Sequence, residues 1–272
     1  MEHILILTVV KNASRWLPQY FDNISKLSYP AKYLSLAFLE SDSTDGTYEM
    51  LESKLKGLTG DFHRTKLIKK DFGYQMPKGL PRWSSQFQIQ RRSILAKSRN
   101  HLLMGSLQDE NWVLWLDIDV VEYPHDVIEQ MLATGKEIIH PNCVHEYGGE
   151  SFDLNAWKDK GRLHMHDLRG GDDLQEIDSV GGTMLMVKAD CHRDGLVFPP
   201  YLYGKKQPRI RKHNTFGRRK DLLNPMKTID AFKKREWQGE IETEGFAMMA
   251  HDMEIGVWAM PNLEIKHPRH SG

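Results

Sequence analysis

A chain of 272 residues, 40% of them hydrophobic, is long enough to bury a substantial core within one domain. Equal numbers of basic and acidic residues, 37 of each, exclude a strong overall field for nucleic acid, so we expect no nucleic-acid partner. Two cysteines, Cys143 and Cys191, lie far apart, which predicts two reduced thiols and no disulfide framework. The first apolar run is too short to cross a bilayer and precedes no cleavage site, so we expect a soluble or cytoplasmic protein without a transmembrane segment.

The first buried strand is predicted from Ile4 to Val10 and is followed by a polar loop. A nucleotide commonly lies beside such a loop in α/β proteins. Lys11 and Arg15 are therefore candidates for contacts with its phosphates, and a solvated loop is the alternative. A helix with apolar residues at helical spacing should follow over about 16–27.

A second strand is predicted from Tyr33 to Leu39, and it ends in a run of short polar residues. The carboxylates of Glu40 and Asp42 would accept hydrogen bonds from a base or a ribose. The alternative is a plain turn, with Thr47 as the N-cap of a helix over 48–55.

A third strand over 65–70 and a long helix over 86–107 come next. The polar side of this helix carries several cationic residues, of which Arg92 and Arg99 are the candidates for the donor diphosphate. A solvated charged face is the alternative.

Two carboxylates end the most apolar strand of the chain, which runs from Trp112 to Leu116. On an extended chain Asp117 and Asp119 would share one face, at the rim where open α/β sheets bind ligands. Hard oxygen ligands suit Mg²⁺ or Mn²⁺, and such an ion suits a diphosphate. This D-x-D pattern resembles that of glycosyltransferases with nucleotide-sugar donors, although a solvated strand end is the alternative.

The second half of the chain contains a long polar stretch between its predicted helices and strands. A helix over 125–132 and a strand over 137–141 precede a long polar stretch over 142–178 that would shape an acceptor cleft. We interpret His164 and His166 in that stretch as surface residues rather than metal ligands. Gly181 and Gly182 begin the next strand, over 179–187, and indicate either a close backbone approach to the donor sugar or a bulge.

The segment over 205–235 holds twelve Lys or Arg residues against two acids, which predicts a mobile basic insert at about 201–240. An apolar helix follows, with Glu242 and Glu244 near its start. These glutamates either cap the helix or face an acceptor hydroxyl. A last strand over 256–260 leads to His267.

Several of these stretches together resemble the fungal Golgi α-mannosyltransferases that build the mannan backbone, and their shorter relatives. The matching stretches include Val113-Leu114-Trp115-Leu116-Asp117-Ile118-Asp119, Gly181-Gly182-Thr183, the run 192–200 and Ile241-Glu242-Thr243-Glu244-Gly245. Another stretch, Leu95-Ala96-Lys97-Ser98-Arg99-Asn100, resembles a segment that such transferases place beside the donor diphosphate. In contrast to the fungal members, we expect no membrane anchor or stem here, and the basic insert is unlike their short link.

The resemblance implies an α/β fold with a single Rossmann-like domain of the GT-A glycosyltransferase type over 1–272, with a mostly parallel central sheet flanked by helices. Residues 1–120 would form the nucleotide-binding half and residues 121–272 the half for the acceptor and the donor sugar. The implied activity is metal-dependent transfer of α-mannose from GDP-mannose to a glycan acceptor, with retention of configuration. The alternatives are a non-catalytic subunit on the same fold or a transferase with a different nucleotide sugar, and a homo-oligomer stays open.

The expected site follows from these patterns and the resemblance. Mn²⁺, or Mg²⁺, would be held by Asp117, Asp119 and His267. Catalysis would use Asp117, Asp119, Glu242 and Glu244, with Gly181 and Gly182 near the donor sugar. The nucleotide would be bound by Thr8, Lys11, Arg15, Glu40, Asp42, Arg92, Arg99 and Asp117.

Overall fold

The computed structural model describes residues 1–58, 60–75, 85–204 and 239–269. The predicted basic insert at about 201–240 therefore lies almost wholly outside the described residues. Among the helices that are described, none is both long and apolar enough to cross a membrane.

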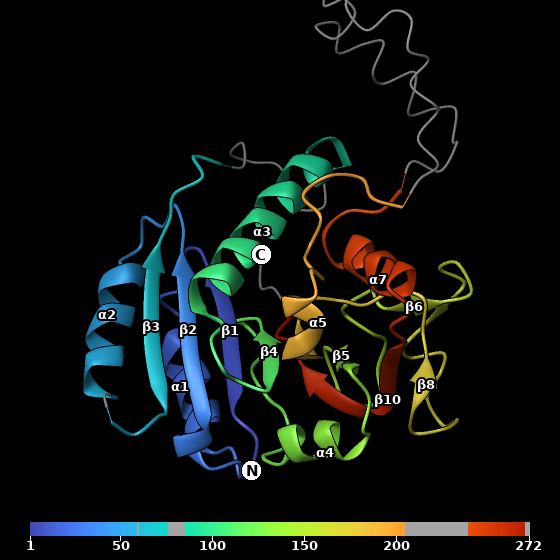
Figure 1. Ribbon diagram of the computed structural model, residues 1–272, viewed down its shortest axis with the longest axis horizontal. Coiled ribbons are helices and arrows are strands. Elements are labelled where there is room, and N and C mark those ends of the chain that lie inside the picture. The colour runs from blue at the N-terminus through green and yellow to red at the C-terminus, as the bar shows by residue number, and fades with distance from the viewer. Residues whose placement is uncertain (59, 76–84, 205–238, 270–272) are drawn as a thin grey trace, which may run out of the picture.

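One large mixed sheet forms the centre of the molecule, with the strand order β3-β2-β1-β4-β9-β5-β10-β8 (Figure 1). Its strands are β1 (Ile4–Val10), β2 (Leu34–Glu40), β3 (Arg64–Lys69), β4 (Trp112–Leu116), β5 (Ile138–Val144), β8 (Gln175–Glu176), β9 (Met184–Lys188) and β10 (Val257–Lys266). Strands β1, β2, β3 and β4 are mutually parallel, and β5 and β10 pair in parallel, whereas β9 is antiparallel to both β4 and β5. The expectation of an α/β fold with a mostly parallel sheet is confirmed.

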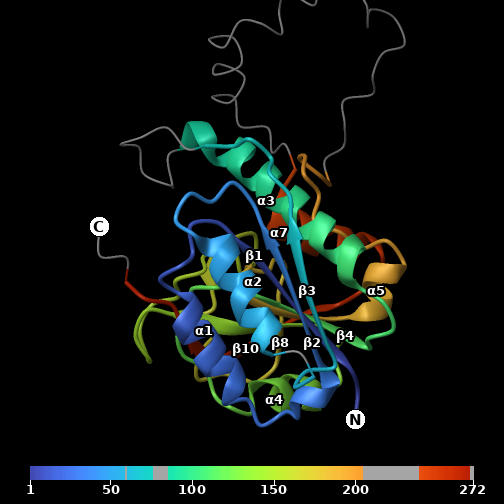
Figure 2. The same ribbon diagram turned by 90° about the vertical axis from the view of Figure 1, so that its left-hand side faces the viewer.

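Helices cover both faces of this sheet, as Figure 2 shows from the side. One face packs against α1 (Leu17–Ser25), α2 (Thr47–Gly57) and α4 (Val127–Ala133). The other face packs against α3 (Ser85–Ser106), α5 (Ala189–Arg193) and α7 (Glu242–Asp252). A small second sheet joins β6 (Trp157–Lys158) to β7 (Leu163–His164) beside α7.

Burial on both faces explains the continuous apolar runs of the central strands. Along β1, Ile4 and Ile6 belong to the core on the α1 side, whereas Leu5 and Leu7 belong to the core on the α3 side. A strand that alternates between two cores needs apolar residues at every position, because neither face meets water. The first strand was predicted from this pattern with the bounds that the structure has.

Two local expectations are wrong. Thr47 is the first residue of α2 rather than its N-cap, which is Gly46 in the left-handed region at φ 80°. The D-x-D residues are not on an extended strand, because β4 ends at Leu116 and residues 118–119 form a turn. That turn is closed by the amide of Val120, which donates to the carbonyl of Asp117 at 3.2 Å.

Candidate active site

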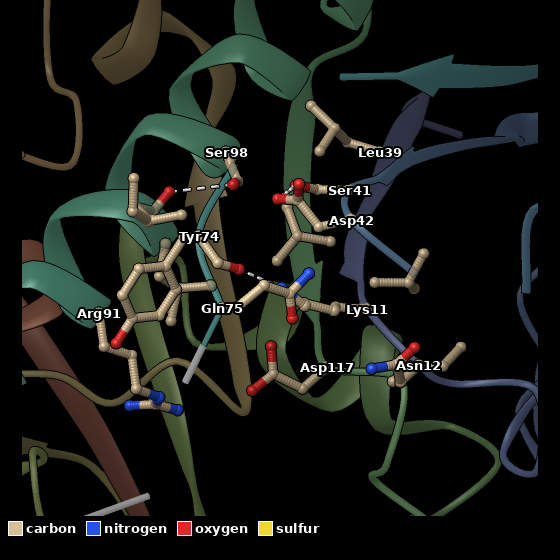
Figure 3. Close-up of a pocket in the computed structure, with 15 residues that line it drawn as sticks. Lys11, Asn12, Leu39, Ser41, Asp42, Tyr74, Gln75, Arg91, Ser98 and Asp117 are labelled. Carbon is tan, nitrogen blue, oxygen red and sulfur yellow. Dashed lines mark hydrogen bonds between the residues drawn. The ribbon is translucent and has the colours of Figure 1, made fainter. Parts of the chain in front are cut away.

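A pocket of about 450 Å³ opens where β1, β2 and β4 end beneath α3 (Figure 3). The parallel direction of these strands brings their carboxyl ends to one edge of the sheet, which is the edge where α/β proteins bind ligands. Helix α3 contacts β1, β2 and β3 and closes the pocket from the other side. The pocket is lined by Val9, Val10, Lys11, Asn12, Leu39, Ser41, Asp42, Tyr74, Gln75, Arg91, Ile94, Leu95, Ser98, Asp117 and Ile118.

The two ends of this pocket differ in chemistry. In the view of Figure 3, Leu39 and Ser98 lie toward one end, whereas Arg91 and Asp117 lie toward the other. The ammonium of Lys11 also lines the pocket and donates to the carbonyl of Tyr74 at 2.5 Å. The end at Leu39 and Ser98 could receive a base, and the cationic side chains of Arg91 and Lys11 suit phosphates.

The turn after β2 holds the two carboxylates that were expected to contact the base or the ribose. Asp42 lines the pocket in a left-handed conformation at φ 54°, and its carboxylate accepts hydrogen bonds from the amides of Phe72 at 3.1 Å and Gly73 at 3.0 Å. Partial burial alone would raise the pKa of Asp42, but the hydrogen bonds from Ser41, Phe72 and Gly73 outweigh it and lower the pKa. Glu40 is buried and accepts from the amide of Ser43 at 2.9 Å, away from the pocket lining.

Two other candidates for nucleotide contacts lie outside the pocket lining. The hydroxyl of Thr8 is buried and shares a hydrogen bond of 2.7 Å with the hydroxyl of Tyr20 on α1. The guanidinium of Arg15 lies 4.6 Å from the centroid of the Trp16 ring. The structure therefore gives Thr8 a core contact and Arg15 an exposed position on the α1 side.

The D-x-D turn faces the end of the last strand. Asp119 Oδ2 lies 3.1 Å from Nε2 of His267, the residue that follows β10. The imidazole is almost fully buried and stacks on Phe152 with 3.7 Å between ring centroids. Burial alone would lower the pKa of His267, but the hydrogen bond and charge of Asp119 outweigh it and raise the pKa. Residues 148 positions apart, 267 minus 119, thus meet at one point.

Asp117 pairs with a buried cation rather than with that imidazole. Arg99 Nη2 lies 3.3 Å from Asp117 Oδ1 and donates to the carbonyl of Gly182, also at 3.3 Å. The side chain of Arg99 is 2% exposed and also forms an ion pair with Glu242. Packing around its carboxyl raises the pKa of Asp117 to about 7, although Arg99 opposes the shift.

The two glutamates at the start of α7 share a second arginine. Arg92 Nη1 lies 2.6 Å from Glu244 Oε2, and Arg92 Nε lies 3.5 Å from Glu242 Oε2. Glu242 is almost fully buried and adopts φ 61°, an uncommon value for a residue with a side chain. Arg92 and Arg99 thus contact the carboxylates of the site, and neither lines the pocket.

Gly181 and Gly182 are required where two charged side chains approach the backbone. A Cβ on Gly181 would overlap the carboxylate of Asp153, and a Cβ on Gly182 would overlap the guanidinium of Arg99. Asp153 Oδ2 accepts from the amides of Gly182 at 2.8 Å and Thr183 at 3.3 Å. The paired glycines therefore allow close approach, but the groups that approach belong to the protein itself.

The residues of the site that were not among the sequence-based candidates include Arg91, Tyr74 and Asp153. Arg91 precedes a chosen candidate by one position, and only the rotation of α3 decides which of the two arginines faces the pocket. Tyr74 and Asp153 lie in loops, where no periodic pattern indicates which way a side chain points.

Only two of the three proposed metal ligands lie close together. Within the described ranges, no three His, Cys, Asp or Glu side chains are arranged closely enough to hold an ion together. Asp119 and His267 form a close pair, whereas Asp117 is turned toward Arg99. Two carboxylates and an imidazole nevertheless make a ligand set that Mn²⁺ accepts, so the residues fit such an ion by chemistry.

The mixed sheet and the acidic turn at its carboxyl edge define a glycosyltransferase fold of the GT-A type. A crystal structure of GalNAc-T7 with UDP, GalNAc and Mn²⁺ shares this fold at a TM-score of 0.54 and 12% sequence identity, covering 99% of this chain and 44% of that one. The chain belongs to the Anp1 family, whose family model matches residues 1–169 and 160–202.

Curated relatives are subunits of fungal complexes. The mannan polymerase II complex anp1 subunit of Schizosaccharomyces pombe is 27% identical over 308 residues, covering 98% of this chain and 64% of the relative. The mannan polymerase complex subunit MNN9 of Candida albicans is 27% identical over 311 residues, covering 98% of this chain and 74% of the relative. The chain thus spans about two thirds to three quarters of their lengths, and the predicted resemblance is confirmed.

Proposed function

We propose that this protein is a metal-dependent glycosyltransferase that transfers α-mannose, with retention of configuration, from GDP-mannose to a hydroxyl of a glycan. The observation that carries the proposal is the position of the D-x-D turn. Asp117 lines the charged end of the pocket, and Asp119 lies 3.1 Å from His267 just beyond it. A bound nucleotide diphosphate would end at this acidic turn if its base occupied the end at Leu39 and Ser98.

The roles of the residues follow from their contacts. Asp117, Asp119 and His267 would hold Mn²⁺, which would act as a Lewis acid on the departing diphosphate. Lys11 and Arg91 both line the pocket and would share the negative charge of the phosphates. Asp42 would take part in binding the base or the ribose, because it lines the pocket from the β2 side.

Mannose and Mn²⁺ are proposed from the relatives. The relatives named above belong to mannan polymerase complexes, and mannan is a polymer of mannose. The GalNAc-T7 structure, which has the same fold, holds a nucleotide together with Mn²⁺. A ligand set that contains an imidazole also suits Mn²⁺ better than Mg²⁺.

A second candidate is a non-catalytic subunit. It is favoured by one observation, that the described part of the chain holds no preassembled cluster of three metal-ligating side chains. Such a subunit would keep the fold and the pocket without the metal-dependent step.

Calorimetric titration tests the proposal. GDP, UDP and ADP are each titrated with Mn²⁺ and again with a chelator, and we expect tight binding of GDP only when Mn²⁺ is present. Binding of UDP in place of GDP would contradict the donor, and equal binding of GDP with and without Mn²⁺ would contradict the metal.

The matched variants are Asp119→Asn and Asp109→Asn. Loss of a residue that merely orients a metal ligand costs about 10- to 100-fold in affinity. Asp119→Asn should therefore weaken Mn²⁺-dependent binding by more than about 100-fold and abolish transfer. Asp109 is exposed and precedes the opposite end of β4, so its variant should behave as the wild type. Full transfer by Asp119→Asn would refute the assignment.

A further inference from the structure

The carboxylate of Glu244 lies between two donors that come from different parts of the chain. Its Oε2 pairs with Arg92 Nη1 on α3 at 2.6 Å. Its Oε1 accepts a hydrogen bond from the indole Nε1 of Trp157, on the small β6–β7 sheet, at 3.2 Å. Both oxygens are therefore engaged, which fixes the carboxylate in one orientation.

A continuous series of ion pairs links this carboxylate to the D-x-D turn. Arg92 contacts both Glu244 and Glu242, Glu242 contacts Arg99, and Arg99 contacts Asp117. The middle of the series is closed to solvent, because Glu242 is 4% and Arg99 is 2% exposed. The two ends are open, because the side chain of Asp117 is 34% and that of Glu244 is 15% exposed. The site therefore has two accessible ends on either side of a buried pair.

The open end at Glu244 carries an indole ring. Trp157 is half-buried, so part of its ring is accessible, and its Nε1 donates to Glu244. Leu154, three residues before Trp157, is 54% exposed, and Ile89, three residues before Arg92 on α3, is 40% exposed. This end thus combines an accessible indole ring with a carboxylate held in place.

A pyranose presents C–H groups on one face and hydroxyls around its edge. An aromatic ring supplies a flat apolar surface for the first, and a carboxylate accepts hydrogen bonds from the second. We propose that Trp157 and Glu244 form the subsite for the acceptor sugar, with Trp157 against the pyranose face and Glu244 accepting a hydrogen bond from a hydroxyl. This inference rests on the proposed function, because the donor occupies the other end. Arg92 is then a positioning residue that holds Glu244.

The test separates acceptor from donor. Transfer from GDP-mannose with Mn²⁺ is measured at varied concentrations of an α-linked mannose disaccharide. Trp157→Leu removes the ring and should raise the KM for the disaccharide by about 10-fold or more, whereas Trp157→Phe keeps a ring and should raise it only about 2- to 5-fold. The KM for GDP-mannose should stay within about 2-fold in both variants, because Trp157 does not line the nucleotide pocket.

Trp258 provides the matched control. It is also half-buried, but it lies on β10 opposite Glu176, with the ammonium of Lys136 at 3.8 Å from the ring centroid. Trp258→Leu should leave the KM for the disaccharide unchanged. An equal rise in Trp258→Leu, or an unchanged KM in Trp157→Leu, would overturn the subsite.

A binding measurement makes the result independent of turnover. Saturation-transfer NMR with the disaccharide alone should show binding to the wild type and to Trp157→Phe, and loss of binding in Trp157→Leu. If GDP still binds with Mn²⁺ while the disaccharide binds wild type and Trp157→Leu alike, the subsite is wrong and the proposed donor stands. If no nucleotide binds at all, the proposed function itself has failed.

Discussion

The guanidinium of Arg99 contacts three groups of the site. It is buried, pairs with Asp117 and Glu242, and donates to the carbonyl of Gly182. A cation removed from water costs several kcal/mol unless carboxylates and hydrogen bonds replace its hydration. Burial lowers the pKa of Arg99, and the charge of Asp117 opposes this shift.

Gly182→Ala tests how tightly this guanidinium is held. The added methyl would overlap the guanidinium, so either the backbone at Gly182 or the pair with Asp117 must shift. We expect a loss of about 1–3 kcal/mol in the free energy of unfolding, as for other overpacked positions, measured by urea denaturation.

Gly57→Ala is the control for this substitution. Gly57 ends α2 with open space around its Cα and an ordinary φ, so alanine should leave stability unchanged or raise it by up to about 1 kcal/mol. Equal stability of Gly182→Ala and the wild type would show that Arg99 moves freely.

Some residues of the site could be located from the sequence, and others could not. Asp117 and Asp119 come directly after β4, so the strand pattern located them. His267 follows β10 and was expected only from the family resemblance. Arg91 and Arg92 lie on α3, which has contacts on both the sheet side and the α7 side. When a helix is covered on two sides, its apolar periodicity no longer shows which charged residue faces a ligand.

At the scale of elements, the loops after β1 and β2 form one wall of the pocket. The loop after β1 and the loop after β2 are joined by hydrogen bonds from the amide of Asn12 to Ser43 at 2.9 Å and from the amide of Ser14 to Asp45 at 3.0 Å. Asp45 also accepts from the amide and the hydroxyl of Thr47, at 3.2 and 2.5 Å. This carboxylate therefore ties the start of α2 to the first loop.

Asp45→Ala should cost about 2 kcal/mol in the free energy of unfolding, because three hydrogen bonds lose their acceptor. Asp61→Ala, an exposed position just after α2, should change it by less than about 0.5 kcal/mol. Equal costs for the two variants in urea denaturation would contradict the role of Asp45.

The low pKa of Asp45 predicts that the stability of the fold depends on pH. Partial burial alone would raise the pKa of Asp45, but the hydrogen bonds from Thr47 and Ser14 lower it to about 2. A depressed pKa in the folded state stabilises the fold above the unfolded value near 4, and this contribution is lost as the pH falls toward 2. Because Asp45 is exposed, solvent screening limits this loss in the free energy of unfolding to about 1 kcal/mol. The loss should be absent when the stability of Asp45→Ala is measured over the same pH range.

The positions of the strands were predicted better than their directions in the sheet. Runs such as 4–10 and 112–116 are apolar at every position, so they could be assigned to buried strands. Nothing in the run 179–187 showed that β9 would insert antiparallel between β4 and β5, because strand direction depends on the path of the intervening chain. The same path carries Asp153 back to Gly181, which no local pattern shows.

At the scale of the whole molecule, one sheet separates two cores, and each core contains one thiol. Cys143 lies in the core on the α1 side and Cys191 in the core on the α3 side. Burial raises the pKa of both thiols, that of Cys191 to about 11, so neither is a ready nucleophile. Central strands contribute side chains to both cores, so we expect the two cores to unfold together.

Single-thiol variants test this coupling. In Cys143→Ala only Cys191 remains, and in Cys191→Ala only Cys143 remains. Both should react with a thiol reagent at the same slow rate in native buffer and rapidly in denaturing urea. A rate at least about 10-fold faster for one thiol in native buffer would show that its core opens separately.

Asp119 and His267 lie far apart in the sequence, so the ribosome adds them to the chain at different times. The residues of the described chain that line the pocket lie at positions 9 to 118. His267 is added 148 residues after Asp119, and β10 joins β5 only then. A growing chain therefore contains these lining residues long before Asp119 gains its imidazole partner. The pocket and the pair of Asp119 with His267 therefore belong to two separate stages of synthesis, although the finished fold places them next to each other.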